Sequence, residues 1–220
     1  EWTFLSNVFS VQSDCPHRER FGYGGDLAVT TDAFIYNYDM ANFYTKVVRD
    51  FQDAALPDGR LTDTAPFVGI DYCGIGWAFS HPLTLLELYQ YYGNISLIQE
   101  QYEAAREWFE VVISNNDLII TKGLSDHESL AAIPTSEMVT PLYYQSAVIM
   151  SRLAEIIDRT EDAKRYKDLS IRIKKAYLDR FQDKGTGKFA PYTQASQSFA
   201  LYTGISPIVK RQDAVYELVK

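Results

Sequence analysis

Apolar residues recur at steps of three and four along most of this sequence of 220 residues, the spacing that gathers them on one face of an α-helix. A strand would need alternation at every second residue, so this periodicity restricts the fold more than any other feature. It predicts an all-α chain. We expect helices at about 26–55, 82–93, 97–113, 140–158, 160–181 and 194–203, followed by the start of a further helix at about 207.

Capping and turn residues mark the ends of several of these helices. Asp26 and Thr160 are suited to accept hydrogen bonds from the first turn of a helix, so each predicts an N-cap. Pro82 and Pro141 predict helix starts, because proline is favoured at the first helical position. The residues at 57–59, Pro-Asp-Gly, predict the turn that ends the first long helix.

Two irregular segments, 56–80 and 115–138, interrupt the helices, and residues 117–120 are compatible with one short strand. Long helices that alternate with extended loops favour a toroid of helix hairpins, an (α/α)6 barrel, over a simple bundle. The number of expected helices corresponds to about half of such a toroid. We therefore expect residues 1–220 to be part of a single (α/α)6 domain that is truncated on its C-terminal side.

Charge and composition exclude several classes of function. The net charge of −8 and the lack of a basic run argue against a nucleic-acid partner. No apolar run approaches the ~20 residues that span a membrane, so we expect no membrane partner. Cys15 and Cys73 cannot make a disulfide framework and have no metal-ligand spacing around them, so we expect no metal site.

One segment, residues 14–26, combines three carboxylates, two arginines, a histidine and three glycines immediately before a predicted helix. Pro16 disfavours helical geometry in the residue before it and the glycines permit tight turns, so the segment should be a loop. Its three carboxylates repel one another, and at least one should keep its proton to a higher pH than a free acid, as a general acid for glycosidic cleavage requires. Arg18 and Arg20 oppose that effect. A network of ion pairs that fixes the loop is the alternative.

Residues 14–26 read DCPHRERFGYGGD, which resembles the DCPQRERLGWxGD signature of α-L-rhamnosidases. The resemblance implies an (α/α)6 catalytic barrel and hydrolysis with inversion at the reacting sugar carbon, without a cofactor. It places the general acid at Glu19. It also places ligands of the sugar hydroxyls at Asp14 and Asp26, with Arg18 beside them.

The resemblance continues at lower specificity over nearly the whole chain. Trp77 matches an aromatic residue that lines the rhamnose pocket in that family. Residues 123–127, GLSDH, resemble a GLGDW loop, which makes Asp126 and His127 candidate ligands. Tyr23 stands where tryptophan is common, and with Trp77 it would contact the apolar face of the sugar. A core tryptophan and a surface loop are the alternative interpretations of Trp77 and of the 123–127 segment.

Other notable residues are interpreted as structural. His81 is expected to support the fold rather than to contact a ligand, and Trp108 lies on a helical face with no charged partner in register, which is typical of a core residue. Residues 192–204 resemble the family's Thr-Gln helix, but no single residue there predicts a contact with the sugar.

The resemblance also places the general base beyond residue 220, so these residues alone are expected to be inactive. The expected substrate is a rhamnose-containing glycoside or polysaccharide, from which terminal α-L-rhamnose is removed. Two alternatives stay open. One is another glycosidase or a lyase on the same toroid, and the other is a carbohydrate-binding helical domain without catalytic activity.

Overall fold

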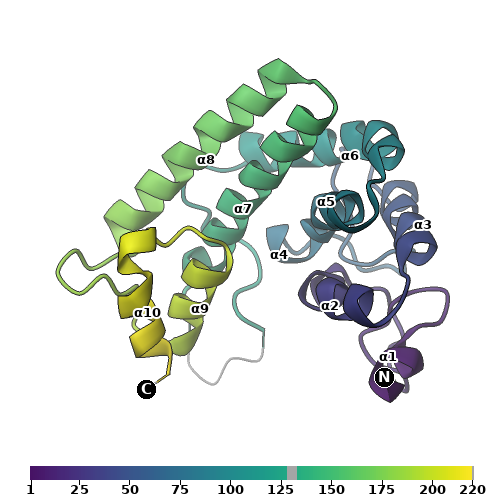
Figure 1. Ribbon diagram of the computed structural model, residues 1–220, viewed down its shortest axis with the longest axis horizontal. Helices are drawn as coiled ribbons and strands as arrows, with labels where there is room; N and C mark the ends of the chain where they lie inside the picture. Colours follow the sequence, from purple (N-terminus) through teal and green to yellow (C-terminus); the bar gives the residue numbers. More distant parts are fainter. Residues whose placement is uncertain (128–132, 220) are drawn as a thin grey trace.

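The computed structural model describes residues 1–127 and 133–219, and within them the chain is all-α (Figure 1). The described residues form no β-strand, and the only β-type pairing among them consists of isolated β-bridges. The all-α prediction is therefore confirmed. The helices are α1 (Trp2–Asn7), α2 (Gly24–Asn37), α3 (Ala41–Asp53), α4 (Ile75–Ala78), α5 (Ser80–Tyr92), α6 (Ile95–Ser114), α7 (Thr135–Ile156), α8 (Thr160–Phe181), α9 (Gln194–Tyr202), the 3-10 turn η1 (Ile208–Lys210) and α10 (Arg211–Leu218).

Successive helices form hairpins: α5 pairs with α6, α7 with α8, and α9 with α10, while a short link joins α2 to α3, which packs on α5 and α6 (Figure 1). The first helix of each hairpin packs against the first helix of the next, so α2, α5, α7 and α9 form an inner row. The second helices α3 and α6 pack against each other outside that row, and α8 lies along α7. This is the hairpin arrangement of an (α/α)6 toroid, as the sequence predicts.

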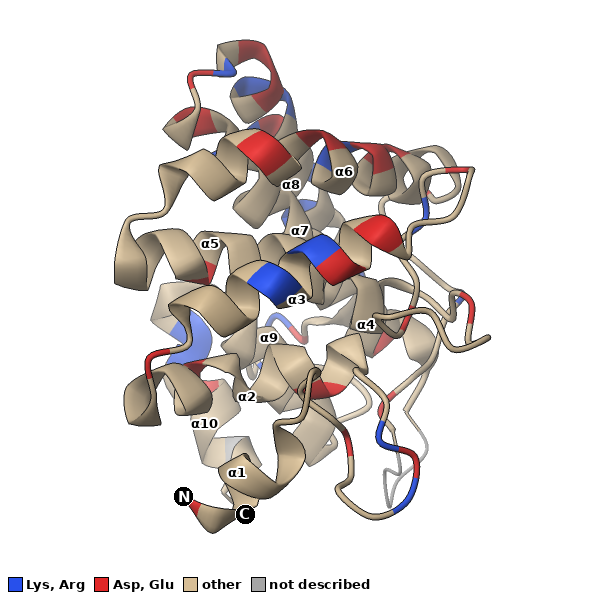
Figure 2. Cartoon of the chain, turned by 90° about the vertical axis from the view of Figure 1, so that its right-hand side faces the viewer, with Lys and Arg blue, Asp and Glu red and all other residues tan. Residues whose placement is uncertain are grey.

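Burial follows from this two-layer arrangement. Every residue of α5 from Ser80 to Leu88 is buried, because α2, α3, α6 and α7 surround that helix. The outer helices are amphipathic instead. The charged residues of α3 and α6 lie on the outward side, whereas α5 is nearly free of charge (Figure 2). Most charged residues of α8 are exposed as well. No helix in the described part of the chain is both long and apolar enough to cross a membrane.

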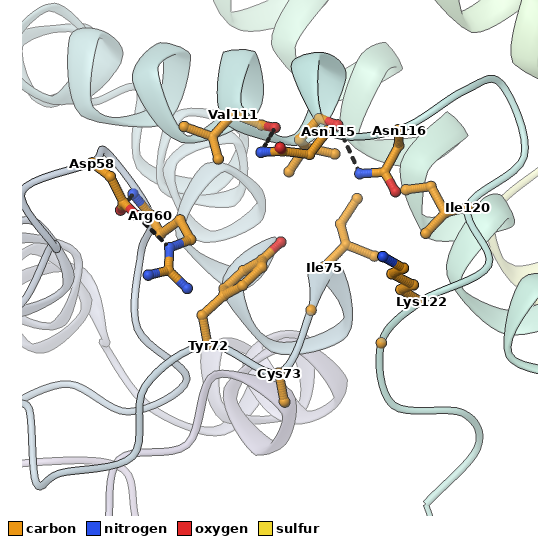
Figure 3. Close-up of a pocket in the computed structure, with 13 residues that line it drawn as sticks. Asp58, Arg60, Tyr72, Cys73, Ile75, Val111, Asn115, Asn116, Ile120 and Lys122 are labelled. Atoms are coloured by element: carbon orange, nitrogen blue, oxygen red, sulfur yellow. Dashed lines mark hydrogen bonds and ion pairs between the residues drawn. The ribbon is translucent and has the colours of Figure 1, made fainter.

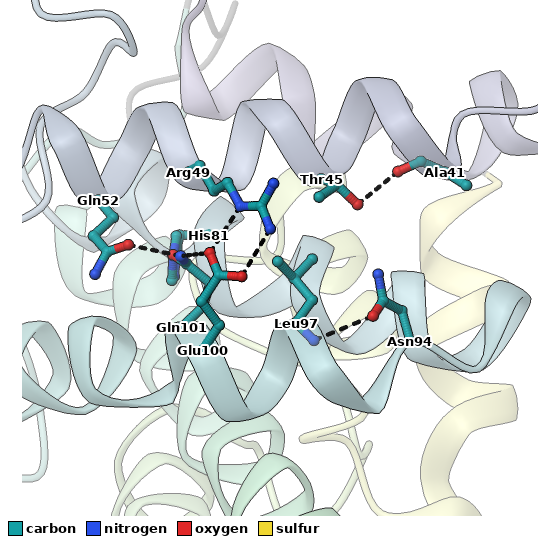
Figure 4. Close-up of polar contacts among 9 residues, drawn as sticks. All are labelled: Ala41, Thr45, Arg49, Gln52, His81, Asn94, Leu97, Glu100 and Gln101. Carbon is teal, nitrogen blue, oxygen red and sulfur yellow. Dashed lines mark hydrogen bonds and ion pairs between the residues drawn. The ribbon is translucent and has the colours of Figure 1, made fainter.

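A seam of polar contacts joins α3 to α6 above α5 (Figure 4). Arg49 makes two hydrogen bonds to the Glu100 carboxylate, of 2.7 and 2.8 Å, and the Gln101 amide donates to Gln52 at 2.6 Å. The buried His81 ring lies 3.3 Å from the Gln101 carboxamide oxygen, and burial lowers its pKa to about 4. His81 is therefore neutral and structural, as expected, and it links α5 to this seam.

The single helix expected at about 26–55 is wrong, because the structure has two helices there. Tyr38 has extended backbone (φ −142°, ψ 155°) and ends α2. The Asp39 carboxylate then accepts the N–H of Ala41, at 3.1 Å, where α3 begins. No proline or glycine marks this break. It is a tertiary effect, since the break lets α2 enter the inner row and α3 the outer one.

The two predicted proline starts are also wrong. Helix α5 begins at Ser80, two residues before Pro82, and Pro141 lies inside α7. A proline within a helix leaves the carbonyl four residues earlier without its donor. Here that carbonyl belongs to Glu137, and the buried Tyr177 hydroxyl of α8 donates to it at 3.3 Å. The contact between α7 and α8 thus supplies the hydrogen bond that the sequence alone lacks.

The remaining boundary predictions differ by a few residues. Helix α2 begins at Gly24 with Asp26 in its first turn, and Thr160 is the first residue of α8, so neither is an N-cap. Residues 117–120 form no strand, and the Ile120 N–H donates to the Thr140 hydroxyl at 3.2 Å. The irregular segment 56–80 contains the short helix α4. Helix α7 begins inside the segment expected to be irregular at 115–138, part of which lies outside the described residues.

Candidate active site

Residues 14–26 were predicted to be a loop, and 14–23 are irregular and closed by local hydrogen bonds, whereas residues 24–26 belong to the first turn of α2. The Asp14 N–H donates to the Phe21 carbonyl at 3.1 Å, and the Phe21 N–H returns to the Asp14 carboxylate at 3.0 Å. Between them, the Glu19 N–H donates to the Cys15 sulfur at 3.1 Å. These bonds fix the turn that carries Glu19. Arg20 lies in the left-handed region, with φ 60°, which few side chains adopt without such support.

Glu19 has one neighbour on each carboxylate oxygen. The Tyr23 hydroxyl donates to Oε2 at 3.2 Å, and the Arg18 guanidinium lies 3.5 Å from Oε1. The Glu19 side chain is 41% exposed and the Arg18 side chain 75% exposed. The Glu19 carboxyl is thus oriented by the Tyr23 phenol but open to a ligand from solvent.

The first turn of α2 packs directly against Trp77. A β-carbon on Gly25 would lie 2.8 Å from Cε2 and Nε1 of the indole, and one on Gly24 would lie 2.3 Å from the Trp77 carbonyl oxygen. Only glycine permits this approach at both positions. The Gly24-Gly25 pair of the motif therefore sets Trp77 beside Asp26.

A cavity of about 240 Å3 opens beside this contact. Four of the predicted site residues line it: Asp26 from α2, Trp77 from α4, and Asp126 and His127 from the loop after α6. The indole of Trp77 and the imidazole of His127 meet edge to face, with ring centroids 6.1 Å apart at 88°. The interpretation of Trp77 as a pocket residue is thus favoured over a core tryptophan. Trp108, by contrast, is fully buried, as expected.

The rest of the cavity lining is mainly apolar, and sequence reasoning missed it. Its side chains come from α2, the segment between α4 and α5, α7 and α9. In the sequence, only the resemblance at 192–204 could have indicated these lining residues, because helical periodicity alone assigns such apolar residues to the core. They are Val29, Phe79, Met138, Leu142, Phe199 and Tyr202.

The remaining candidates lie outside the cavity lining. Asp14, Arg18, Glu19 and Tyr23 are absent from the described residues that line it. They are nevertheless near in electrostatic terms, since the charges of Asp14 and Glu19 both raise the pKa of Asp26. The candidate site therefore has two parts, a lined cavity and an acidic loop beside it.

Burial is the first cause of the two pKa shifts resolved in the motif. It raises the pKa of Asp26, and the charge of Asp14 adds to the effect. Burial also raises the pKa of Tyr23 to about 12, helped by its hydrogen bond to Glu19. The expected rise in pKa is thus seen at Asp26. Tyr23 is neutral and acts as a donor at physiological pH.

Donor atoms of Asp14, Cys15 and Glu19 lie within 4.8 Å of one another. The set mixes two hard carboxylates with a soft thiol, and the Cys15 sulfur already accepts the Glu19 N–H. Cations that prefer oxygen and cations that prefer sulfur each find only part of their ligand set here. We assign no metal to this loop.

Two buried carboxyl groups on the inner-row helices were not singled out by the sequence, nor was the buried Asp63 in the loop before α4. Burial raises the pKa of Glu87 on α5 to about 8, and the charge of Asp32 raises it further. Burial raises the pKa of Glu137 on α7 to about 7, against the opposing charge of Arg180. Neither is among the described residues that line the cavity. Both sit on inner-row helices, where two layers of packing exclude water.

Comparison with solved structures agrees with this fold. The chain superimposes on an α-L-rhamnosidase from Dictyoglumus thermophilum with a TM-score of 0.89 and 28% identity, covering 99% of this chain and 26% of that one. It superimposes on a Streptomyces avermitilis α-L-rhamnosidase complexed with L-rhamnose with a TM-score of 0.87 and 29% identity, covering 99% of this chain and 21% of that one.

Curated relatives give the same picture. The chain is 29% identical over 223 residues to an α-L-rhamnosidase of Streptomyces avermitilis, and 23% identical over 235 residues to one of Formosa agariphila. These alignments cover 99% and 100% of this chain but 21% and 25% of the relatives. A family model described as the bacterial alpha-L-rhamnosidase 6 hairpin glycosidase domain matches residues 1–220. The chain therefore belongs to the family of bacterial α-L-rhamnosidase six-hairpin glycosidase domains.

Proposed function

We propose that this domain takes part in the hydrolysis of rhamnosides, in which terminal α-L-rhamnose is released from a glycoside or polysaccharide. One observation carries the proposal: the lining of a cavity of about 240 Å3 combines two carboxyl groups and an indole with mainly apolar side chains. L-Rhamnose is a 6-deoxy sugar, with hydroxyls on one part of its ring and a methyl group at C5. A relative complexed with L-rhamnose supports the same substrate.

In this proposal, Glu19 is the general acid and protonates the glycosidic oxygen as the bond to the sugar breaks. Tyr23 orients the Glu19 carboxyl through its hydrogen bond of 3.2 Å. Asp14 and Asp26 bind sugar hydroxyls, with Arg18 beside them. Burial and the charge of Asp14 raise the pKa of Asp26, and its carboxyl oxygens accept hydrogen bonds from the sugar hydroxyls.

In this proposal, different residues of the cavity contact different parts of the sugar. Trp77 presents its indole to the apolar face of the ring, while Asp126 and His127 bind polar groups at the cavity rim. The methyl group then packs against the apolar wall, where Met138 and Phe199 are available. A hydroxymethyl group in the same place would lose its hydrogen bonds to water, which disfavours the corresponding hexose.

We further propose that hydrolysis inverts the configuration at C1. Inversion requires a base that directs water to the face opposite the acid, with the two carboxyl groups about 6.5–9.5 Å apart. The water forms the new bond to C1, gives one proton to the base, and the first product is β-L-rhamnose. In this proposal the base belongs to a part of the protein outside residues 1–220.

The test uses the natural protein that contains this domain and compares Glu19→Gln with the wild type on two substrates. One is a rhamnose-containing disaccharide and the other is an aryl rhamnoside, whose good leaving group needs little protonation. We expect the variant to lose most activity on the disaccharide, on the order of 100-fold or more, and to keep much of it on the aryl rhamnoside. Glu155→Gln, on the exposed face of α7, is the matched control.

Other outcomes would point elsewhere. Equal and small losses on both substrates would mean that Glu19 only fixes the loop, and the acid would have to be another residue. Binding of rhamnose without hydrolysis by the wild type would favour a carbohydrate-binding domain. Cleavage of other glycosides in preference to rhamnosides would favour a different glycosidase or a lyase on the same toroid.

A further inference from the structure

A second cavity lies beside the candidate active site (Figure 3). Its volume of about 580 Å3 falls in the range of roughly 300–1,000 Å3 that small-molecule sites occupy. The turn after α3, the segment that leads into α4, the last turn of α6 and the loop after α6 enclose it. Among the described residues, none lines both cavities.

Two touching loops separate the cavities. The Leu124 N–H donates to the Cys73 carbonyl at 3.2 Å, and a β-carbon on Gly74 would lie 3.0 Å from the Gly123 α-carbon. Gly74 has φ 137°, so both its conformation and its close neighbour require glycine. Beyond this contact, the next residues diverge: Ile75 lines the second cavity and Gly76 the first.

The second cavity offers hydrogen-bond donors from two cations with different surroundings. Arg60 bonds the Asp58 carboxylate through Nε at 2.8 Å and lies 3.7 Å from Asp71, so its charge is balanced. Lys122 makes no ion pair within the described part of the chain and lies on the opposite side of the cavity (Figure 3). Both retain N–H groups that no described residue uses.

Acceptors come from the end of α6. The Asn115 side-chain N–H donates to the Val111 carbonyl at 2.9 Å, and that of Asn116 to the Val112 carbonyl at 2.8 Å. Their carboxamide oxygens are left as acceptors. The C-terminal end of a helix also carries a partial negative charge, which disfavours an anion there. The Lys122 ammonium on the other side, which makes no ion pair within the described residues, disfavours a positively charged ligand. A neutral ligand with both donors and acceptors therefore fits this cavity.

Tyr72 supplies an aromatic surface in the middle of the cavity (Figure 3). The Arg60 guanidinium carbon lies 5.8 Å from its ring centroid. Burial raises the pKa of Tyr72 to about 12, so the phenol is neutral at physiological pH. A phenol offers an apolar face and a polar tip, which suits a ligand with C–H groups on one face and hydroxyls around its edge.

We propose that this cavity is a binding site for a neutral saccharide, separate from the candidate active site. The sugar ring lies against Tyr72. Its hydroxyl groups donate hydrogen bonds to the carboxamide oxygens of Asn115 and Asn116. Its hydroxyl oxygens accept hydrogen bonds from Arg60 and Lys122. This proposal does not depend on rhamnoside hydrolysis, because the two cavities have different walls. It gives the protein a second point of attachment to a glycan.

The test is ligand-observed saturation-transfer NMR on the natural protein with maltose, cellobiose and lactose, and with glucuronate as an anionic probe. Val111→Phe places a ring in the cavity from a half-buried position on the last turn of α6, with Val209→Phe, 87% exposed in η1, as its control. Lys122→Ala removes one donor, with Lys184→Ala as its control. Thermal unfolding of each variant checks that the fold is kept.

We expect transfer to at least one neutral disaccharide, loss of it in Val111→Phe, and binding weaker by about tenfold in Lys122→Ala. Asp26→Asn, in the first cavity, should leave saturation transfer to the neutral disaccharide unchanged. The proposal is overturned if no neutral disaccharide receives saturation, if glucuronate binds in preference, or if binding survives Val111→Phe. Loss in Asp26→Asn instead would move the site to the first cavity.

Discussion

The Tyr23 hydroxyl donates a hydrogen bond of 3.2 Å to Oε2 of Glu19 and so ties the candidate acid to the residue that precedes α2. The two residues are four apart in a loop, not in a helix, and the Asp14 to Phe21 hydrogen bonds hold that loop in shape. The fold of the loop, which brings the Tyr23 hydroxyl to the Glu19 carboxylate, therefore orients the candidate acid.

Tyr23→Phe keeps the ring and removes only this hydrogen bond. We expect kcat on an unactivated rhamnoside to fall on the order of tenfold, because the carboxyl loses its fixed direction, while KM changes little. The alkaline limb of the pH–kcat profile, where activity falls as the general acid gives up its proton, should also move. Steady-state kinetics across pH measures both. Tyr192→Phe, on an exposed tyrosine, is the control, and an unchanged profile in Tyr23→Phe would contradict a positioning role.

Gly25→Ala should displace Trp77, because its β-carbon would lie 2.8 Å from the indole. Overpacking of this kind costs about 1–3 kcal/mol, so we expect a lower free energy of unfolding and a higher KM. Urea unfolding and kinetics measure the two effects. Gly185→Ala is the control, since its nearest atom would be a flexible carboxylate oxygen at 3.4 Å. Equal behaviour of the two variants would show that Trp77 moves aside without consequence.

Glu87 should make stability depend on pH. Its folded pKa of about 8 exceeds the ordinary value of about 4.3, so the unfolded state loses its proton first as pH rises. The contribution of this group is full below about pH 4.3 and is lost progressively toward pH 8, by an amount on the order of a few kcal/mol.

Glu87→Gln imitates the protonated carboxyl and removes this dependence. Relative to the wild type, the variant should gain stability between pH 4.5 and pH 8, measured by urea unfolding at each pH. Glu107→Gln, on the exposed face of α6, controls for the change of charge. A stability difference that does not vary with pH would mean that Glu87 is ionised in the folded protein.

Tyr177→Phe leaves the Glu137 carbonyl without a donor, since Pro141 cannot supply one. The buried carbonyl then costs about 1–3 kcal/mol of stability. Pro141→Ala restores a backbone N–H four residues after Glu137. In a double-mutant cycle by urea unfolding, Tyr177→Phe should therefore cost less in the Pro141→Ala background. Additive effects would show that the hydroxyl and the proline act independently.

Local sequence determined a large part of this protein. Apolar periodicity identified the helices now seen as α5 to α9, because a buried helical face needs residues at steps of three and four. Pro16 and the glycines predicted a loop over residues 14–26, which is correct for 14–23 and wrong for 24–26, where α2 has begun. The 14–26 motif also identified the family, which the fold and the relatives confirm.

Tertiary structure decided the rest. The break at Tyr38 and the interior position of Pro141 depend on packing partners, α5 and α8, that no local window contains. The cavity joins Asp26, Trp77 and His127 with Phe199 from four separate segments, and the burial that raises the pKa of Asp26 exists only once they meet. Periodicity reports which face of a helix is buried, but not what buries it, so the apolar wall of the site became visible only in the folded chain.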